Sequence, residues 1–318
     1  MTRTLLVASA GGHLDELMIH IDRLGIDRSS TIWVTSPTPQ TESLLSGQDV
    51  VWVPRVGSGE IAKAALGLPA AMKIHRRIRP DLVVSTGALF STPHLLAAAL
   101  AGCETWFIDS ATRVAGPSST GKFVQRFTKA KLYTQSDRWT DQRWTPVPSV
   151  FDAFEAYELP IADRPSKLAR ATVSLGSELW QFPRAIERVE RLLPDADVTW
   201  QVGVTEYSRE GQPLPQWLPA NKLRAAIALS DVVVMHAGVG SVLVALDEGK
   251  VPVILPRRQH HKEMVDDHQT EIASVLAERG LAISVDPDDL SLDHLVRAAS
   301  LSARRRANFS RRDTQPTQ

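Results

Sequence analysis

Short apolar runs recur along the chain, and each is followed by a segment with helix-like spacing. Runs rich in Val, Ile and Leu between such segments are typical of buried parallel strands joined by crossover helices. In the first half we expect strands at 4–9, 31–36, 50–54, 81–87, 105–110 and 131–136. The alternation restarts after residue 170, with strands expected at 171–176, 198–203, 231–236, 251–256 and 282–285.

The segment 152–168 separates the two series of strands and contains prolines and charges without a hydrophobic period. Such a composition predicts a linker. We therefore expect an α/β protein with two Rossmann-like, doubly wound domains, residues 1–155 and 156–300, facing each other across a cleft. Domains of this kind bind ligands at the carboxyl ends of their strands. Residues 301–318 are basic and polar, and we expect them to form a disordered tail.

Composition narrows the classes of function. The 318 residues carry 36 Lys and Arg against 36 Asp and Glu, so the formal net charge is zero. Broad nucleic-acid binding needs a basic surplus, and we expect no such partner. The single cysteine, Cys103, cannot form an internal disulfide, which fits a reducing cytoplasm. The longest apolar stretch begins at Leu95 and is far shorter than the ~20 residues that span a bilayer, so any membrane association is expected to be peripheral.

A glycine turn follows the first expected strand. Gly11 and Gly12 permit a tight turn, and His13 stands where a helix with one apolar face begins. A turn of this kind at a helix N-terminus offers N–H groups to an anion or a reacting oxygen. The third glycine of a dinucleotide fingerprint is missing, so that function is not supported. A plain strand-to-helix turn with an exposed histidine explains the same letters.

A second glycine turn follows the strand expected at 231–236. Gly238 and Gly240 leave room for a diphosphate, and Ser241 is in a position to be the helix N-cap. His236, at the end of the strand, is either a packed imidazole or points into the cleft.

Polar residues crowd the segment after the strand expected at 251–256. It holds His260, His261 and His268 together with Asp266 and Asp267. Their spacing fits no zinc signature, and polar groups at the carboxyl end of a strand also bind sugars and riboses. We favour hydrogen bonding to a sugar over a metal site.

The stretch from Gly116 to Lys122 matches a phosphate-binding P-loop, but Phe123 stands where that motif needs the Ser or Thr that ligates Mg²⁺. Five residues also separate Gly116 from the preceding expected strand. We therefore predict a loop that leads into a helix.

Several of these segments together resemble a known family. The stretches QFPRAIERVE, WQVG, HAGVGSVLVALDEGKVPVILPRR and VDDHQTEIA resemble the donor-binding domain of glycosyltransferase family 28. The stretches SAGGHLDELM, RPDLVVSTGALFSTP and FIDSATRVAGPSSTGK resemble the partner subunit of two-chain enzymes that build lipid-linked saccharides. Such enzymes include bacterial exopolysaccharide transferases and the eukaryotic transferase that adds the second N-acetylglucosamine to its dolichol-linked acceptor. The resemblance covers roughly residues 3 to 286 and looks like a fusion of both partners, with the GT-B fold.

The resemblance implies inverting transfer of a sugar from a UDP-sugar to a prenyl-diphosphate-linked saccharide, without a catalytic metal or a cofactor. It also implies a cytoplasmic enzyme in peripheral contact with the inner face of the plasma membrane. The general base falls on His13. The implied acceptor-side residues are Gly11, Gly12, Ser85, Thr86, Gly87, Arg113 and Lys122. The implied donor-binding residues are Gly176, Ser177, His236, Gly238, Gly240, Ser241, Asp267, His268 and Gln269.

One departure and two rival functions remain at this point. Relatives carry a ribose-binding glutamate near the position of Val244, and Asp247 and Glu248 follow it in this chain. A UDP-sugar 2-epimerase has the same two-domain plan, and a non-catalytic donor-binding subunit is the third reading. The segment 57–80 mixes apolar residues with lysines and arginines, and it fits either a helix that rests on an anionic membrane or an ordinary surface helix.

Overall fold

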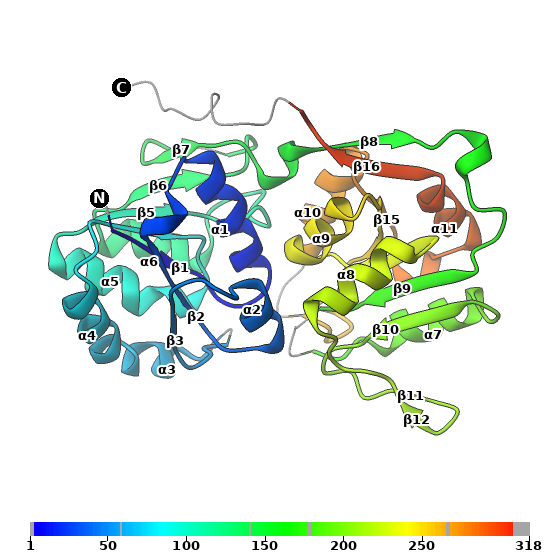
Figure 1. The fold of residues 1–318 in the computed structure, drawn as a ribbon, viewed down its shortest axis with the longest axis horizontal. Coiled ribbons are helices and arrows are strands. Elements are labelled where there is room, and N and C mark those ends of the chain that lie inside the picture. Colours follow the sequence, from blue (N-terminus) through cyan, green and yellow to red (C-terminus); the bar gives the residue numbers. More distant parts are fainter. Residues whose placement is uncertain (1–2, 58, 140, 177–179, 265–267, 308–318) are drawn as a thin grey trace. The chain divides into compact units, whose positions relative to one another are not determined.

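The computed structural model describes residues 3–57, 59–139, 141–176, 180–264 and 268–307 (Figure 1). The chain divides into two compact units, of which the first runs to Val150 and the second begins at Phe151. Each unit is an α/β domain built on a parallel sheet. Among the helices of the described residues, none has both the length and the apolar character needed to cross a membrane.

The first unit contains a seven-stranded sheet in the order β3-β2-β1-β4-β5-β6-β7, parallel throughout. The first six strands match the expected runs, whereas β7 is not anticipated by the sequence pattern. The order of the strands reverses between β1 and β4, and such reversal points are where open α/β sheets bind ligands. The strands are β1 (Thr4–Val7), β2 (Thr31–Thr35), β3 (Val50–Trp52), β4 (Leu82–Ser85), β5 (Glu104–Ile108), β6 (Lys131–Thr134) and β7 (Trp144–Pro146).

Helices cover both faces of this sheet, because side chains along each strand alternate between two apolar clusters. On β1, Leu5 joins the cluster that contains Leu95, and Leu6 joins the cluster that contains Leu17. All four side chains are almost fully buried. The helices are α1 (Gly12–Arg23), α2 (Pro39–Leu44), α3 (Ile61–Leu66), α4 (Leu68–Ile78), α5 (Thr92–Ala101) and α6 (Ser119–Phe127).

The second unit contains a five-stranded parallel sheet in the order β10-β9-β13-β14-β15. Its order reverses between β9 and β13. The strands are β9 (Arg170–Ser174), β10 (Asp197–Gln201), β13 (Val232–His236), β14 (Val253–Leu255) and β15 (Ile283–Ser284). The helices are α7 (Pro183–Leu192), α8 (Ala220–Leu229), α9 (Val239–Asp247), α10 (His268–Glu278) and α11 (Leu292–Ala299).

An antiparallel ribbon corrects two predictions, the structureless linker and the start of the disordered tail. β8 (Phe154–Glu158) lies in the expected linker, and β16 (Leu301–Arg305) lies at the start of the expected tail; the two strands pair along their length in the second unit (Figure 1). Two of the basic residues that suggested a tail, Arg304 and Arg305, belong to β16. Arg304 pairs with Glu155 at 2.7 Å and Arg305 with Asp247 at 2.8 Å.

We predict that shortening a core side chain on α5 destabilises the first unit. Replacement of the fully buried Leu95 by alanine removes apolar contacts and leaves a cavity, which costs about 2–5 kcal/mol of unfolding free energy. On the same helix Leu100 is 69% exposed, so Leu100→Ala is the matched control and changes stability by less than about 0.5 kcal/mol. Denaturant unfolding of both variants checks this, and equal effects would contradict the assignment of the core.

Candidate active site

His13 is joined to the segment after β4 by two reciprocal hydrogen bonds. Its Nδ1 lies 2.8 Å from the main-chain oxygen of Thr86, and Thr86 Oγ1 donates to the main-chain oxygen of His13 at 2.6 Å. His13 is the second residue of α1, which follows β1, and β1 is paired with β4. The two bonds therefore connect the carboxyl ends of the two strands at the reversal point, with Thr86 fully buried.

This contact determines which ring nitrogen of the imidazole carries the hydrogen, and burial determines the charge of the ring. A carbonyl oxygen only accepts, so Nδ1 must carry the hydrogen, and in the neutral ring the lone pair is on Nε2. Burial of the ring lowers the pKa of His13 to about 4, with a smaller contribution in the same direction from the charge of Arg113. The hydrogen bond to Thr86 opposes this shift only in part. At neutral pH the ring is uncharged, with Nε2 ready to accept a proton.

Two glycines allow the chain to turn at this point. Gly11 has φ 91° as the residue before α1, and Gly87 has φ 104° beside the histidine. A side chain at Gly87 would meet the Phe107 ring at 3.4 Å and His13 Cε1 at 3.7 Å. Ser85 supports the turn, because its Oγ accepts from the N–H of Gly87 at 3.1 Å. Gly12 begins α1 directly before the histidine.

Arg113 lies at the end of a tight turn after β5, where its N–H donates to the main-chain oxygen of Ser110 at 2.9 Å. Its positive charge lowers the pKa of His13 and also acts to lower the pKa of Asp109. The structure thus brings Arg113 to the side of the His13 and Thr86 pair. Lys122 is exposed on α6.

The P-loop resemblance is explained by α6. Ser118 is the N-cap of this helix, and its Oγ accepts from the N–H of Gly121 at 2.8 Å. Gly121 and Lys122 of the apparent motif therefore lie inside the helix, which agrees with the predicted loop leading into a helix.

Sequence reasoning missed a buried carboxyl group one turn after His13. Glu16 is 1% exposed and accepts hydrogen bonds from Ser110 Oγ at 2.7 Å, from the N–H of Ala111 at 3.0 Å and from Gln135 Nε2 at 2.6 Å. The signal was present, since an acidic residue stands among the apolar positions of α1 that include Leu17. Its partners come from distant parts of the chain and could not be read from that spacing.

In the second unit, His236 is packed between two glycine turns and does not stand as an exposed ligand. The imidazole occupies the space that a Cβ at Gly176 would need, with Cε1 2.1 Å from that position. It also lies 2.2 Å, through Nε2, from the position of a Cβ at Gly238. Burial lowers the pKa of His236 to about 3, helped by the nearby charge of Arg257. The histidine is therefore neutral, and its ring packs between the turn after β9 and the turn after β13.

Ser241 is not the N-cap of α9 as the sequence suggested. The N-cap is Gly238, in extended conformation, and Ser241 is the third helical residue, with Oγ 3.4 Å from His236 Nδ1. Because glycine lacks a capping side chain, the first N–H groups of the helix are left for another acceptor. The first helical hydrogen bond runs from Val242 N to Gly238 O at 3.1 Å, so Val239, Gly240 and Ser241 precede it.

Arg257 and Gln269 hold the turn after β9 in place through hydrogen bonds. Arg257 is 1% exposed, and its guanidinium donates to the main-chain oxygens of Leu175 at 3.0 Å and Trp180 at 2.7 Å. Gln269 is also buried, and its Oε1 accepts from the N–H of Arg257 at 3.1 Å. Gln269 thus has a structural partner where a sugar contact was expected. Ser177 and Asp267 lie outside the described residues, as does the side chain of His268.

The predicted ribose-binding region contains no unpaired carboxylate among its described candidates. Val244 is packed in the apolar cluster of α8 and α9. Glu248 pairs with Arg224 at 2.7 Å, and Asp247 pairs with Arg305. Both carboxylates therefore stabilise the contacts of α9 with α8 and β16.

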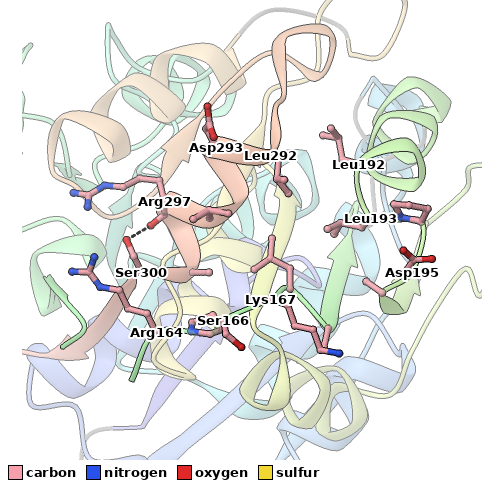
Figure 2. A pocket seen from close by; sticks show the side chains of 17 residues that line it. Arg164, Ser166, Lys167, Leu192, Leu193, Asp195, Leu292, Asp293, Arg297 and Ser300 are labelled. Atoms are coloured by element: carbon pink, nitrogen blue, oxygen red, sulfur yellow. Dashed lines mark hydrogen bonds between the residues drawn. The ribbon is translucent and has the colours of Figure 1, made fainter. Parts of the chain in front are cut away.

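A groove of about 800 Å³ lies at the other end of the strands of the second unit, near the amino-terminal ends of β9 and β10 (Figure 2). Leu192, Leu193 and Leu292 line one side, and Arg164 and Arg297 lie on the other. Ligands of parallel sheets bind at the carboxyl ends of strands, so we place the site at the glycine turns and not in this groove. No group of three His, Cys, Asp or Glu side chains among the described residues is arranged to hold a metal ion.

Comparison with known proteins agrees with this architecture. No protein-family model matches the chain. The chain is 26% identical over 259 residues to the UDP-N-acetylglucosamine–N-acetylmuramyl-(pentapeptide) pyrophosphoryl-undecaprenol N-acetylglucosamine transferase of Shewanella sp. (strain W3-18-1), covering 76% of this chain and 68% of the relative. It is 25% identical over 334 residues to the protein of that name from Burkholderia pseudomallei (strain 1106a), covering 92% and 86%.

Solved structures give the same fold. MurG of Acinetobacter baumannii matches with a TM-score of 0.55 and 19% identity, over 93% of this chain and 89% of that one. The spinosyn forosaminyltransferase SpnP matches with a TM-score of 0.59 and 18% identity, over the same shares of the two chains. The chain has the GT-B fold and is similar to glycosyltransferases of family 28. Its origin as a fusion of two partner subunits stays a prediction.

We predict that Gly238→Ala destabilises the second unit chiefly through a clash with His236, since the backbone of Gly238 suits any residue. The added methyl group would overlap the imidazole, and overpacking of this kind costs about 1–3 kcal/mol. In a His236→Ala background the same substitution should cost only about 1 kcal/mol or less, because the ring is gone and only the weaker N-cap preference of alanine remains. Unfolding free energies of the four proteins check this.

Gly116→Ala is the control for this cycle, since a Cβ there meets nothing within 4 Å. An undiminished penalty for Gly238→Ala in the His236→Ala background would show that the ring does not separate the two turns.

Proposed function

We propose that the protein transfers a sugar, with inversion, from a UDP-sugar to a prenyl-diphosphate-linked saccharide. The observation that carries the proposal is the neutral imidazole of His13. Its hydrogen is on Nδ1, which donates to the main-chain oxygen of Thr86, so the lone pair on Nε2 is available to accept a proton. The names of the curated relatives specify UDP-N-acetylglucosamine as donor and a pyrophosphoryl-undecaprenol acceptor. That chemistry agrees with what each unit of this chain offers.

His13 is the proposed general base. The attacking hydroxyl of the acceptor must lose its proton as it bonds to the anomeric carbon, and Nε2 of a neutral imidazole accepts it. Such a base contributes typically 10²- to 10⁴-fold, so other groups must supply the remaining acceleration. A pKa of about 4 keeps the ring neutral throughout the physiological range, at the cost of a weaker driving force for proton transfer.

The turn after β13 is the proposed site for the donor diphosphate. The N–H groups of Val239, Gly240 and Ser241 precede the first helical bond of α9 and can donate to phosphate oxygens. The dipole of the helix adds about 0.3–2 kcal/mol, and direct charge-assisted hydrogen bonds to the departing UDP add more. The ring of His236 packs against Gly238 in this turn and against Gly176 in the neighbouring turn after β9, which Arg257 and Gln269 support.

The acceptor diphosphate is assigned to Arg113 together with the turn of Ser85, Thr86 and Gly87. A guanidinium binds phosphate oxygens in a bidentate manner, and Arg113 lies close enough to His13 to influence its pKa. An acceptor anchored there by its diphosphate would present its sugar hydroxyl to Nε2. The exposed Lys122 is a weaker candidate for the same role.

The membrane that holds a prenyl-linked acceptor is proposed to contact α3 and α4, on the cytoplasmic side. Ile61 is 70% exposed and Leu66 80% exposed, and basic residues accompany them. Exposed apolar side chains among cations are typical of surfaces that enter the headgroup region of anionic lipid. The exposed basic residues are Lys63, Lys73, Arg76, Arg77 and Arg79.

The experiment that tests the transferase function supplies a panel of UDP-sugars with a short-chain prenyl-diphosphate saccharide and measures release of UDP. We expect release only when the acceptor is present. Interconversion of the UDP-sugar without acceptor would favour the 2-epimerase, and binding without either reaction would favour a donor-binding subunit.

We predict that His13→Ala lowers kcat by about 10²- to 10⁴-fold while the fold is kept. His294→Ala in α11, which also removes one imidazole, is the control and should keep normal activity. Because the pKa of His13 is depressed, its neutral form persists as the pH falls, and the acid limb of the rate at saturating acceptor should lie well below pH 6.5. A limb centred near 6.5, or full activity of His13→Ala, would remove His13 from this role.

We also predict that Ile61→Asp with Leu66→Asp weakens binding to vesicles that contain anionic lipid, because both side chains leave the apolar region. The exposed Leu229 of α8, replaced by aspartate, is the control on the second unit. Vesicle co-sedimentation measures the effect, and equal binding of all variants would place the membrane contact elsewhere.

A further inference from the structure

Glu16 is a buried carboxyl group that the proposed mechanism does not use. It lies on α1 one turn after His13, and it contacts the turn after β5 and the segment after β6. Burial of a carboxylate is costly unless hydrogen bonds replace the lost water, and three donors surround this one. Such an arrangement in an enzyme suggests a role near the reaction.

The three donors differ in what they can do. The N–H of Ala111 and the amide group of Gln135 can only donate to Glu16, whereas the hydroxyl of Ser110 can donate or accept. The ionised carboxylate satisfies all three at once. When Glu16 gains a proton, the bond to Ser110 must reverse, and the Ser110 hydrogen then loses its carboxylate acceptor. Protonation of Glu16 therefore changes the hydrogen bonding of Ser110 before that of its other two partners.

Ser110 is the start of the turn that carries Arg113. Its Oγ accepts from the N–H of Thr112 at 3.3 Å and from Thr112 Oγ1 at 3.2 Å, and its main-chain oxygen accepts from the N–H of Arg113. Glu16 thus binds the first two residues of a four-residue turn through Ser110 and Ala111. The shape of this turn sets the position of the Arg113 main chain, from which its side chain extends.

The other titratable groups around Glu16 lie at the end of β5 and on α1. Asp109, at the end of β5, is buried and accepts from the N–H of Ser118 at 2.7 Å. Burial also raises the pKa of Asp109, and the charge of Arg113 opposes that rise. On α1 itself, burial lowers the pKa of His20 to about 3, and the charge of Arg23 adds to this shift.

Arg23, two turns after Glu16 on α1, donates to the main-chain oxygens of Pro148 and Ser149 at 2.8 Å each. From the segment after β6, Gln135 is uncharged, and its Oε1 accepts from the N–H of Val150 at 3.0 Å. Burial raises the pKa of Glu16 to about 7, with Asp109 a minor contributor, and the three hydrogen bonds limit the rise. The carboxyl group is consequently poised between its two states near neutral pH.

We propose that Glu16 is a positioning residue for the acceptor. Its carboxylate holds the Ser110–Arg113 turn in the form that presents Arg113 to the acceptor diphosphate, and its protonation weakens acceptor binding. The proposal rests on the transferase function proposed above. It adds a control of acceptor affinity by pH that acts through Arg113 and leaves the donor turn of the second unit unaffected.

The test compares the acceptor KM, the donor KM and kcat of the wild type and Glu16→Gln between pH 5.5 and pH 8.5. If binding requires the carboxylate, the acceptor KM of the wild type rises roughly tenfold from pH 8 to pH 6, because about nine-tenths of a group with a pKa near 7 is protonated at pH 6. In Glu16→Gln the acceptor KM should be high and independent of pH. The donor KM should be unchanged, and Asp22→Asn, which removes an exposed carboxylate from the same helix, should behave as the wild type.

Two measurements keep the proposal separate from the transferase function. Glutamine can meet all three partners of Glu16 if Ser110 accepts, so Glu16→Gln is expected to fold. If the wild type releases no UDP with acceptor present, the proposed function fails. If the wild type is active but its acceptor KM follows the same pH curve as that of Glu16→Gln, or if the donor KM changes instead, the role of Glu16 is overturned.

Thermal unfolding provides the readout that needs no activity. Because the folded pKa of Glu16 is raised, the wild type should lose stability relative to Glu16→Gln as the pH rises from about 4.5 to about 7. A difference in Tm that is constant over this window would show that Glu16 does not titrate there, and would also overturn the proposal.

Discussion

The two hydrogen bonds exchanged by His13 and Thr86 are the interaction on which the first half of the site depends. They join the chain after β1 to the chain after β4, at the point where the order of the sheet reverses. The same contact fixes the tautomer of the imidazole, because a main-chain oxygen can only accept. Structure and reactivity therefore come from one pair of bonds, and the buried strands on both sides of it make the geometry rigid.

The second unit uses a histidine differently at the equivalent place. His236 also ends a strand at a reversal point, yet its ring fills the space between Gly176 and Gly238. Its hydrogen-bonding contacts are to the main chain of Ser174 and, at 3.4 Å, to Ser241. The glycines are therefore needed first for the imidazole, and the open N–H groups of α9 follow from the absence of a capping side chain at Gly238. Arg257 completes this support from within the unit. One unit contains the proposed base, and the other contains the proposed anion-binding turn.

Much of this could be predicted from the sequence, since runs of β-branched residues gave the central strands and the glycine turns marked both reversal points. The failures have physical reasons. β16 contains Arg304 and Arg305, whose charges suggested solvent and instead pair with Glu155 and Asp247. β7 is a three-residue edge strand and too short to show a period. Glu16 acquires its role from Ser110 and Gln135, which are distant in sequence, so no local pattern could reveal it.

The most direct test of the proposed chemistry is the anomeric configuration of the product. An α-linked UDP-sugar and a prenyl-diphosphate saccharide are incubated with the protein, and proton NMR of the purified glycolipid measures the coupling of the new anomeric proton. Direct displacement by a hydroxyl activated at His13 predicts a β linkage, with a large diaxial coupling for a gluco-configured sugar. An α-linked product would contradict a single inverting displacement, and a changed UDP-sugar with no glycolipid would contradict the transferase itself.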